Sequence, residues 1–302
     1  MSLLACVLSA NQENNNETNI FNKIKPINVS TAELVNALKK LEVINRARDC
    51  LIEIFNSWVN LPTTYWFDIP QTIENCGRSI RASIPLIEAG PENYERKYYM
   101  LPQLKYVSES CSVITFGIGG EIVAEKHIQM SFPHCSFIGF DPNPNYEKLF
   151  VDDLGGKFVK TAVGGKSGKN TIFQLQKSGY AKTPETQIRS AAELIETYHG
   201  KDKIIDILNI DIEGSEYGIF EEMLKDKIFE NICQINVEIH PIWYYNPGYS
   251  YSEVITLFKK LTENGTFIWV KTFVHRFQFF PSYFINVKNK KCMEKYLKNR
   301  LY

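Results

Sequence analysis

The sequence has neither an excess of charge of one sign nor a long apolar run, and each absence argues against one class of protein. Its 302 residues carry 34 basic and 34 acidic side chains, so the formal net charge is zero. A neutral chain lacks the basic surface that binds nucleic-acid phosphates, which argues against a nucleic-acid substrate. No run of eighteen apolar residues occurs, so we expect no membrane-spanning helix. The locally basic segment Lys288–Arg300 is expected to be a solvated tail.

Paired cysteine motifs are also missing. The seven cysteines are scattered without a C-x-x-C pair, so no zinc site is expected and no residue is assigned as a metal ligand. Cys135 and Cys233 lie in expected strands and are interpreted as core residues. Cys76 and Cys111 lie outside the expected strands and could pair in an oxidising compartment.

The composition divides the chain into three regions. Residues 1–29 are Asn-rich and polar and predict a flexible N-terminus, in which the apolar Ser2–Ala10 resembles a remnant of a signal segment. Residues 30–105 predict a helical and irregular extension, with a capping box and helical spacing of apolar residues up to about residue 60. Residues 106–302 form the third region, which begins shortly before the first expected strand.

Strands and helices alternate along this third region, which favours one doubly wound α/β sheet. The last two expected strands are separated by a short loop and predict a hairpin. The expected strands lie near 113–116, 136–140, 157–162, 205–211, 232–239, 266–271 and 278–286. The expected helices lie near 120–131, 144–150, 187–199, 216–228 and 251–264. The glycine run 164–168 is interpreted as a turn.

The segment Ile204–Glu216 is the most informative part of the chain. It is an apolar run that ends in carboxylates and a glycine, as a buried parallel strand does at the mouth of an α/β sheet. Asp211 and Glu213 are two residues apart and share one face of the strand end. Ligands bind at this edge of open α/β sheets. The competing interpretation is helix capping, which applies most to Glu216.

A glycine-rich turn points to the same edge. Gly117, Gly119 and Gly120 follow a short apolar strand, and a second strand ends some twenty residues later in Asp141, which could accept ribose hydroxyls. A dinucleotide fingerprint needs a further glycine where Ile122 stands. A carboxylate at Glu121 would also repel a pyrophosphate, whereas it suits a ligand that carries an amino group and a sulfonium.

A third cluster follows in Val237–Pro241. Glu238 and His240 share a strand face, and Pro241 ends the strand. We expect both side chains to lie beside Asp211 if the two strands are neighbours. A lone histidine is usually structural, but one that is paired with a carboxylate at a strand's carboxyl end favours a functional role.

The chain resembles the FkbM-type family of S-adenosylmethionine-dependent methyltransferases. The matching segments are F-G-I-G-G at 116–120, F-D-P-N-P at 140–144, T-A-V-G at 161–164, D-I-E-G-S-E at 211–216 and V-E-I-H-P at 237–241. The glycine turn is closest to that of animal members. The resemblance implies a Rossmann-like class I sheet of seven strands, the last antiparallel, and identifies 106–302 as the methyltransferase domain.

The cofactor implied by this resemblance is S-adenosylmethionine. One departure concerns the acid that many class I enzymes carry two residues before the first glycine, where this chain has Thr115. Glu121 or main-chain carbonyls are therefore expected to hold the amino group of the cofactor, and the adenine is expected against Ala162 and Val163. The full expected set is Phe116, Gly117, Ile118, Gly119, Gly120, Glu121, Asp141, Pro142, Ala162, Val163 and Asp211.

Methyl transfer to a hydroxyl needs a positioned acceptor and a base that removes its proton. Asp211, Glu213, Glu238 and His240 are the expected catalytic residues. His240 is the first candidate for the base because its ordinary pKa lies near neutrality, and Asp211 and Glu213 are the alternatives. The acids could instead hold a cation such as Mg²⁺ that acidifies the hydroxyl.

The sequence therefore predicts an O-methyltransferase that acts on a hydroxyl of a glycan or small molecule. The alternatives are a non-catalytic binding module with the same fold and a nicotinamide-dependent oxidoreductase. The apolar start and three sequons, at Asn16, Asn28 and Asn264, favour the secretory pathway over the cytoplasm.

Overall fold

The computed structural model describes residues 31–91, 96–176, 179–243, 248–273, 279–298 and 300–301. By its internal contacts the chain forms two units, Met1–Leu38 and Lys39–Tyr302, and the second unit holds the sheet and the candidate site. The expectations for 1–29, including Ser2–Ala10 and the sequons at Asn16 and Asn28, lie outside the described residues.

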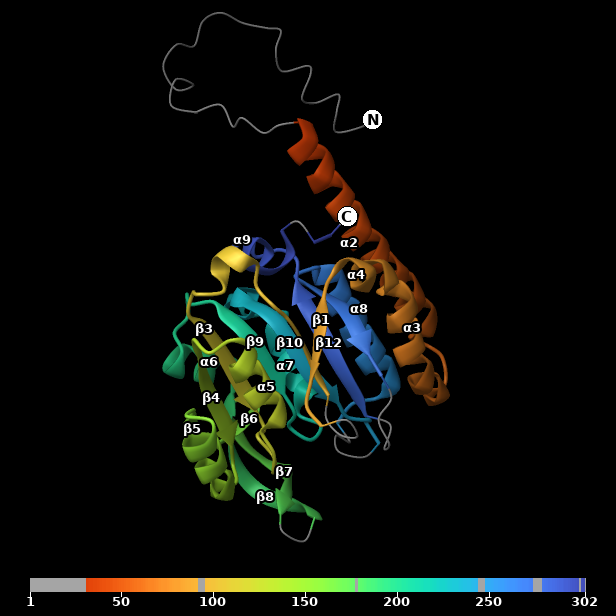
Figure 1. Ribbon diagram of the computed structural model, residues 1–302. Coiled ribbons are helices and arrows are strands. Elements are labelled where there is room, and N and C mark those ends of the chain that lie inside the picture. Colours follow the sequence, from red (N-terminus) through yellow and green to blue (C-terminus); the bar gives the residue numbers. More distant parts are fainter. Residues whose placement is uncertain are drawn as a thin grey trace, which may run out of the picture. The chain divides into compact units, whose positions relative to one another are not determined.

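The second unit is built on a seven-stranded sheet with the strand order β11-β12-β10-β9-β3-β4-β5 (Figure 1). The last strand of the chain, β12, runs antiparallel to both of its neighbours, and the pairs from β10 to β5 are parallel. The predicted seven-stranded sheet with its last strand antiparallel is confirmed. The strands are β3 (Cys111–Phe116), β4 (Cys135–Asp141), β5 (Lys157–Lys160), β9 (Ile205–Ile210), β10 (Ile232–Ile239), β11 (Phe267–Thr272) and β12 (Phe280–Asn286).

Helices bury the apolar side chains of this sheet in separate clusters. One cluster joins the helices α6 (Ala191–Tyr198), α7 (Glu216–Met223) and α8 (Tyr251–Asn264) to the sheet. Another joins α5 (Val123–Ser131) to β3 and β4. The helix α8 has bounds as predicted, because a complete capping box starts it at Ser250 and Gly265 ends it with a φ of 68°.

Helical segments precede the sheet along the chain. The long helix α2 spans Thr31–Trp58, and in its second half Ile44, Ala47, Leu51, Phe55 and Trp58 are buried. It is followed by η3 (Thr63–Asp68), α3 (Ile69–Cys76) and α4 (Arg78–Ser83). Leu51, Phe55 and Trp58 of α2 belong to the same buried cluster as the residues of α6, α7 and α8.

A short hairpin, β1 (Leu86–Ala89) with β2 (Lys97–Met100), lies where the sequence indicated irregular chain. Side-chain amides of β10 form hydrogen bonds with the backbone of β2, in the way that the backbone of a neighbouring strand would. Asn236 bonds both the N–H and the C=O of Tyr98, and Gln234 does the same for Met100. Side-chain pairing of this kind leaves no strand-like apolar alternation, so pattern analysis missed it.

A second, three-stranded sheet contains β6 (Ala162–Gly164), β8 (Gly179–Ser190) and β7 (Gly168–Gln176) in that order. The interpretation of 164–168 as a turn was incomplete, and the helix expected from 187 begins at 191, after the Ser190 cap. The hairpin β7–β8 is drawn in green in Figure 1. Its strands are rich in Lys, Thr, Gln and Glu, so they carry little of the apolar alternation that identifies strands.

Within the described residues, three disulfides correct the interpretation of the cysteines. They join Cys50 to Cys76, Cys111 to Cys135 and Cys233 to Cys292. Cys135 and Cys233 are therefore cross-linked rather than plain core residues, and Cys76 does not pair with Cys111. Register explains one of the pairs, because Cys111 and Cys135 are partner positions on the neighbouring strands β3 and β4.

The basic C-terminal segment is only partly solvated: Lys288, Lys290, Lys291 and Lys298 are exposed, but other residues of the segment are packed. Lys295 is 8% exposed and its Nζ lies 2.7 Å from Asp206 Oδ1, while Leu297 and Leu301 are buried. The remaining short elements are η4 (Leu104–Tyr106), η5 (Pro144–Tyr146), η6 (Leu149–Asp153), η7 (Lys227–Asn231), α9 (Lys290–Cys292) and η8 (Met293–Leu297). The helix expected near 144–150 is thus replaced by two short turns of helix.

Candidate functional site

A pocket lies at the carboxyl ends of β3 and β9, where the order of the parallel strands reverses. Such a switch point is where open α/β sheets bind ligands. The expected cofactor residues line this pocket, with two exceptions. Phe116 and Ile118 are 0% and 5% exposed and face the core, so they contribute backbone rather than side chains.

The glycine turn is shaped by close contact with the neighbouring strand end. A Cβ on Gly117 would lie 1.7 Å from the carbonyl oxygen of Asp211, and the residue has a φ of +80°. Glycine is therefore required here both for space and for conformation. A Cβ on Gly119 or Gly120 would meet nothing within 4 Å, because these residues border the open pocket.

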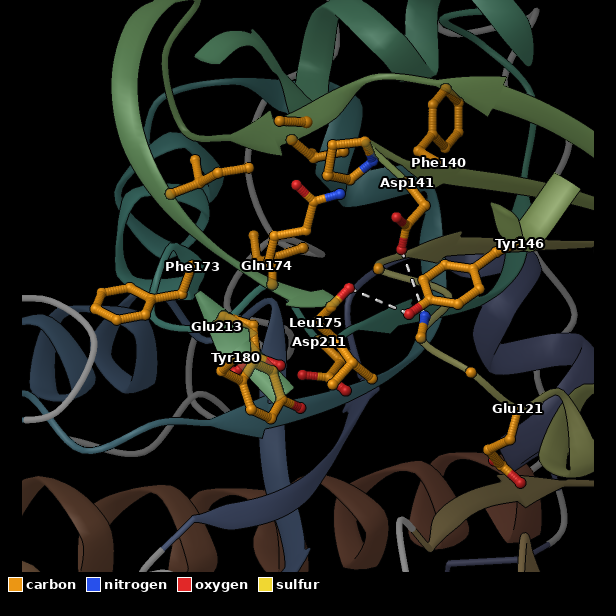
Figure 2. A pocket seen from close by; sticks show the side chains of 18 residues that line it. Glu121, Phe140, Asp141, Tyr146, Phe173, Gln174, Leu175, Tyr180, Asp211 and Glu213 are labelled. Carbon is orange, nitrogen blue, oxygen red and sulfur yellow. Dashed lines mark hydrogen bonds between the residues drawn. The ribbon is translucent and has the colours of Figure 1, made fainter. Parts of the chain in front are cut away.

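Asp141 ends β4 and holds the glycine turn in place. Its Oδ2 accepts hydrogen bonds from the N–H groups of Ile118 at 2.9 Å and Gly119 at 3.4 Å, and its Oδ1 accepts one from Asn143 at 2.7 Å. Burial raises the pKa of Asp141, and these backbone N–H groups oppose the rise. The carboxylate is thus positioned by the turn and faces the pocket (Figure 2).

Beyond the pocket, four carboxylates surround His240, which is 1% exposed. The His240 Nδ1 lies 2.9 Å from Glu216 Oε1. The His240 Nε2 lies 3.2 Å from Glu213 Oε2, 3.8 Å from Asp211 Oδ1 and 3.9 Å from Glu238 Oε1. The four residues expected to converge at the strand ends therefore do so, and Glu216 joins them.

The acids change the protonation of this histidine. Burial alone would lower the pKa of His240, but the charges of Glu216 and Glu213 and their hydrogen bonds outweigh burial. The pKa of His240 is therefore raised well above its usual value, which favours the doubly protonated ring.

The D-I-E-G-S-E segment adopts a turn that is closed by its own last residue. The Oε1 of Glu216 accepts hydrogen bonds from the backbone N–H groups of Ile212 at 3.1 Å and Gly214 at 3.2 Å. Glu213 has a φ of +55°, which is uncommon for a residue with a side chain. Such strained positions concentrate at functional sites, where the surrounding contacts hold them.

Asp211 also lines a second, smaller pocket on its other side. There it meets Glu238, Asn236 and two basic residues of the preceding hairpin, Arg96 and Lys97. Lys97 is 9% exposed and pairs with the buried Glu125 at 3.2 Å. Glu125 also lies 3.3 Å from the hydroxyl of Thr115, so an acid from α5 stands beside the position where the motif acid is missing.

Several residues of the site escaped the sequence analysis. Glu216 belongs to the matching segment D-I-E-G-S-E, with helix capping as its competing interpretation, but it was not among the expected site residues. Ile172, Phe173, Gln174, Leu175 and Tyr180 line the cofactor pocket from the unpredicted β7–β8 hairpin, and Tyr146 lines it from the loop after β4. No motif marks these residues, so no signal in one sequence could have identified them.

Comparison with known proteins identifies the family of this chain. The chain matches the model of the "Methyltransferase FkbM domain" family over residues 60–265. A search of curated proteins finds no significant match. The similar solved structures include two at 10% sequence identity each. A Methanococcus jannaschii fibrillarin pre-rRNA processing protein has a TM-score of 0.36 and matches over 67% of this chain and 82% of its own. The plantazolicin methyltransferase BpumL, solved with SAH, has a TM-score of 0.30 and matches over 84% of this chain and 98% of its own. Since the family match spans well over half of the residues, the chain belongs to the FkbM methyltransferase family.

Proposed function

We propose that the protein is an S-adenosylmethionine-dependent O-methyltransferase that acts on a hydroxyl of a glycan or small molecule. The observation that carries the proposal is the position of Asp211, which lines both the cofactor pocket and the smaller pocket beside Glu238. A methyl donor in the first pocket and a hydroxyl in the second would meet at this carboxylate. The acceptor hydroxyl could then approach the methyl group and lose its proton beside the same carboxylate.

The residues of the larger pocket fit the proposed methyl donor. The glycines leave an open cradle for the methionine part of the donor, and Asp141 offers carboxylate lone pairs to the ribose hydroxyls. Buried Ala162 and Val163 provide an apolar wall for the adenine. Once bound, the donor supplies an electrophilic methyl on sulfur, while the protein positions the acceptor and takes up its proton.

The protonation of His240 favours a carboxylate as the base. An imidazolium held between Glu216 and Glu213 has no lone pair with which to accept the acceptor's proton. Asp211 is 19% exposed at its side chain and lies at the boundary of both pockets, so it is the preferred base. In this arrangement His240 neutralises part of the negative charge and orients Glu213.

Methyl transfer from a radiolabelled donor to a panel of glycans and small hydroxyl compounds tests the proposal. We expect labelled product from the wild type and at least a 10²-fold lower rate from Asp211→Asn. Binding of S-adenosylhomocysteine without transfer to any acceptor would favour the non-catalytic module instead. Binding of NAD without S-adenosylhomocysteine would favour the oxidoreductase.

A cation-assisted version of the reaction remains the alternative for this cluster. One ligand atom each from Asp211, Glu216 and His240 lies within 4.8 Å of the others, and carboxylate oxygens are ligands that Mg²⁺ prefers. In that version His240 would have to lose a ring proton. Activity that disappears on chelation and returns with added Mg²⁺ would support the cation, whereas activity insensitive to chelation would support Asp211 alone.

We further propose that the protein resides in the secretory pathway. Three disulfides within the described chain are typical of an oxidising compartment. The sequon residue Asn264 is exposed at the end of α8. No helix among the described residues has the length and apolarity to cross a bilayer. Expression in animal cells tests the location: a mobility shift on glycosidase treatment that Asn264→Gln reduces would support it, and unmodified protein in the cytosol would refute it.

A further inference from the structure

We propose that Gln174 recognises the adenine ring of the methyl donor from the β7–β8 hairpin. The inference rests on the use of S-adenosylmethionine proposed above. It assigns a base-reading role to a residue that lies outside the segments matching the family motifs.

The adenine end of the pocket can be located from the ribose. Asp141 at the end of β4 marks the ribose, and the glycine turn lies on one side of it. The strand β6 lies beyond, where Ala162 is buried in a small apolar cluster with Ile172 and Ile188 of the hairpin. An apolar slot between strand and hairpin suits a flat aromatic ring.

The pairing register of the hairpin turns Gln174 toward this slot. Gln174 is two residues after Ile172, so both side chains leave β7 on the same face. Its cross-strand partner is Ala181, whose small side chain leaves room for a ligand beside the amide. The carboxamide reaches into the cavity that Asp141 lines (Figure 2).

The hairpin is tied to the loop that follows Asp141. The backbone carbonyl of Leu175 accepts hydrogen bonds from Asn143 Nδ2 at 3.2 Å and from the Tyr146 hydroxyl at 3.3 Å. Gln174 therefore has a fixed position relative to the ribose carboxylate. A binding group held in this way loses less conformational entropy when the ligand arrives.

The chemistry of the carboxamide matches an adenine edge. Adenine presents its 6-amino donor beside a ring-nitrogen acceptor, and a glutamine amide can meet both with its oxygen and its NH₂ group. The Thr183 hydroxyl lies 3.5 Å from Gln174 Oε1 and helps to orient the amide. On the N7 edge hypoxanthine has an oxygen in place of the 6-amino group, so it presents two acceptors there and cannot make the same pair of bonds.

Calorimetric titration with S-adenosylhomocysteine and with its inosine analogue tests the assignment. The wild type should prefer the adenine ligand by about 5- to 150-fold, the discrimination expected of one bidentate amide–adenine pair. Gln174→Ala should lose most of this preference, and Gln174→Met, which keeps the length without hydrogen bonding, should lose it too. Gln187→Ala, a matched change on the exposed part of β8, should retain it.

The other possible results of this titration each contradict one specific claim. Equal binding of the two ligands by the wild type, or an unchanged preference in both Gln174 variants, would overturn the role of Gln174. A wild type that binds neither ligand would overturn the proposed methyl donor, and the base-reading role with it.

Discussion

His240 and Glu216 form a buried ion pair in which Nδ1 of the ring lies 2.9 Å from Oε1 of the acid, and both side chains are nearly inaccessible to solvent. The pair joins the end of β10 to the start of α7. Because the same carboxylate oxygen closes the Ile212–Gly214 turn, one side chain fixes both the histidine and the carboxylates around it. Glu216 is therefore a positioning residue rather than a helix cap.

Replacing Glu216 tests this relationship. Glu216→Gln keeps an acceptor for the turn but removes the charge, so the free energy of unfolding should fall by about 1.5–3 kcal/mol. The raised pKa of His240 gives stability that is complete below its unfolded pKa near 6.5 and is lost as pH rises through the folded value. In the variant this loss should shift to lower pH. Urea unfolding across pH and NMR titration of the ring measure both effects.

The control for that experiment is Glu230→Gln, because Glu230 is an exposed acid in η7. It should leave the titration of His240 as in the wild type. An unchanged His240 titration in Glu216→Gln would contradict the assigned pair.

The glycine turn offers a steric prediction. Gly117→Ala forces a Cβ against the Asp211 carbonyl and a side chain into a left-handed conformation, so it should unfold the turn and strongly destabilise the protein. Gly120→Ala adds a methyl group where nothing lies within 4 Å, so it should fold normally but bind S-adenosylhomocysteine more weakly. Thermal unfolding and calorimetry separate the two effects, and equal stability of the two variants would contradict the close contact.

The ribose role of Asp141 predicts a loss of cofactor affinity. Asp141→Ala should weaken S-adenosylhomocysteine binding by about 1.5–3 kcal/mol, the usual range for hydrogen bonds to a charged group. It should also loosen the turn, since Ile118 and Gly119 lose their acceptor. Calorimetry gives the affinity, and wild-type affinity in this variant would remove Asp141 from the site.

A half-buried acid on α7 predicts how stability depends on pH. Burial raises the pKa of Glu222 from 4.5 to about 7. The folded state therefore binds more protons than the unfolded state between these values, so stability should fall as pH rises from about 4.5 to 7. Glu222→Gln removes this loss, so the variant should gain stability relative to the wild type at pH 8 but not at pH 4. Unfolding at both pH values measures it, with the exposed Glu196→Gln as control. A variant with the wild-type pH dependence would contradict the shifted pKa.

The parts of the fold that were predictable share one property, which is that they bury apolar side chains at regular spacing. The strands of the main sheet and the helix α8 follow this pattern closely, and β10 occupies the predicted range Ile232–Ile239. The hairpins β1–β2 and β7–β8 do not. One is held by the side-chain amides of Gln234 and Asn236, and the other is largely polar, so neither leaves a periodic signal.

The sequence by itself determined which chemistry is present: carboxylates at the ends of two apolar strands, a histidine beside them, and glycines before a ribose acid. Local spacing suffices for this, because residues two apart on a strand share a face. The tertiary structure alone decided how these groups act together. The neighbouring placement of β9, β10 and α7 brings Glu216 onto His240 and raises the pKa of the ring, and the β7–β8 hairpin closes the pocket with Gln174. Contacts between distant segments depend on packing and register, and no local pattern in the sequence encodes them.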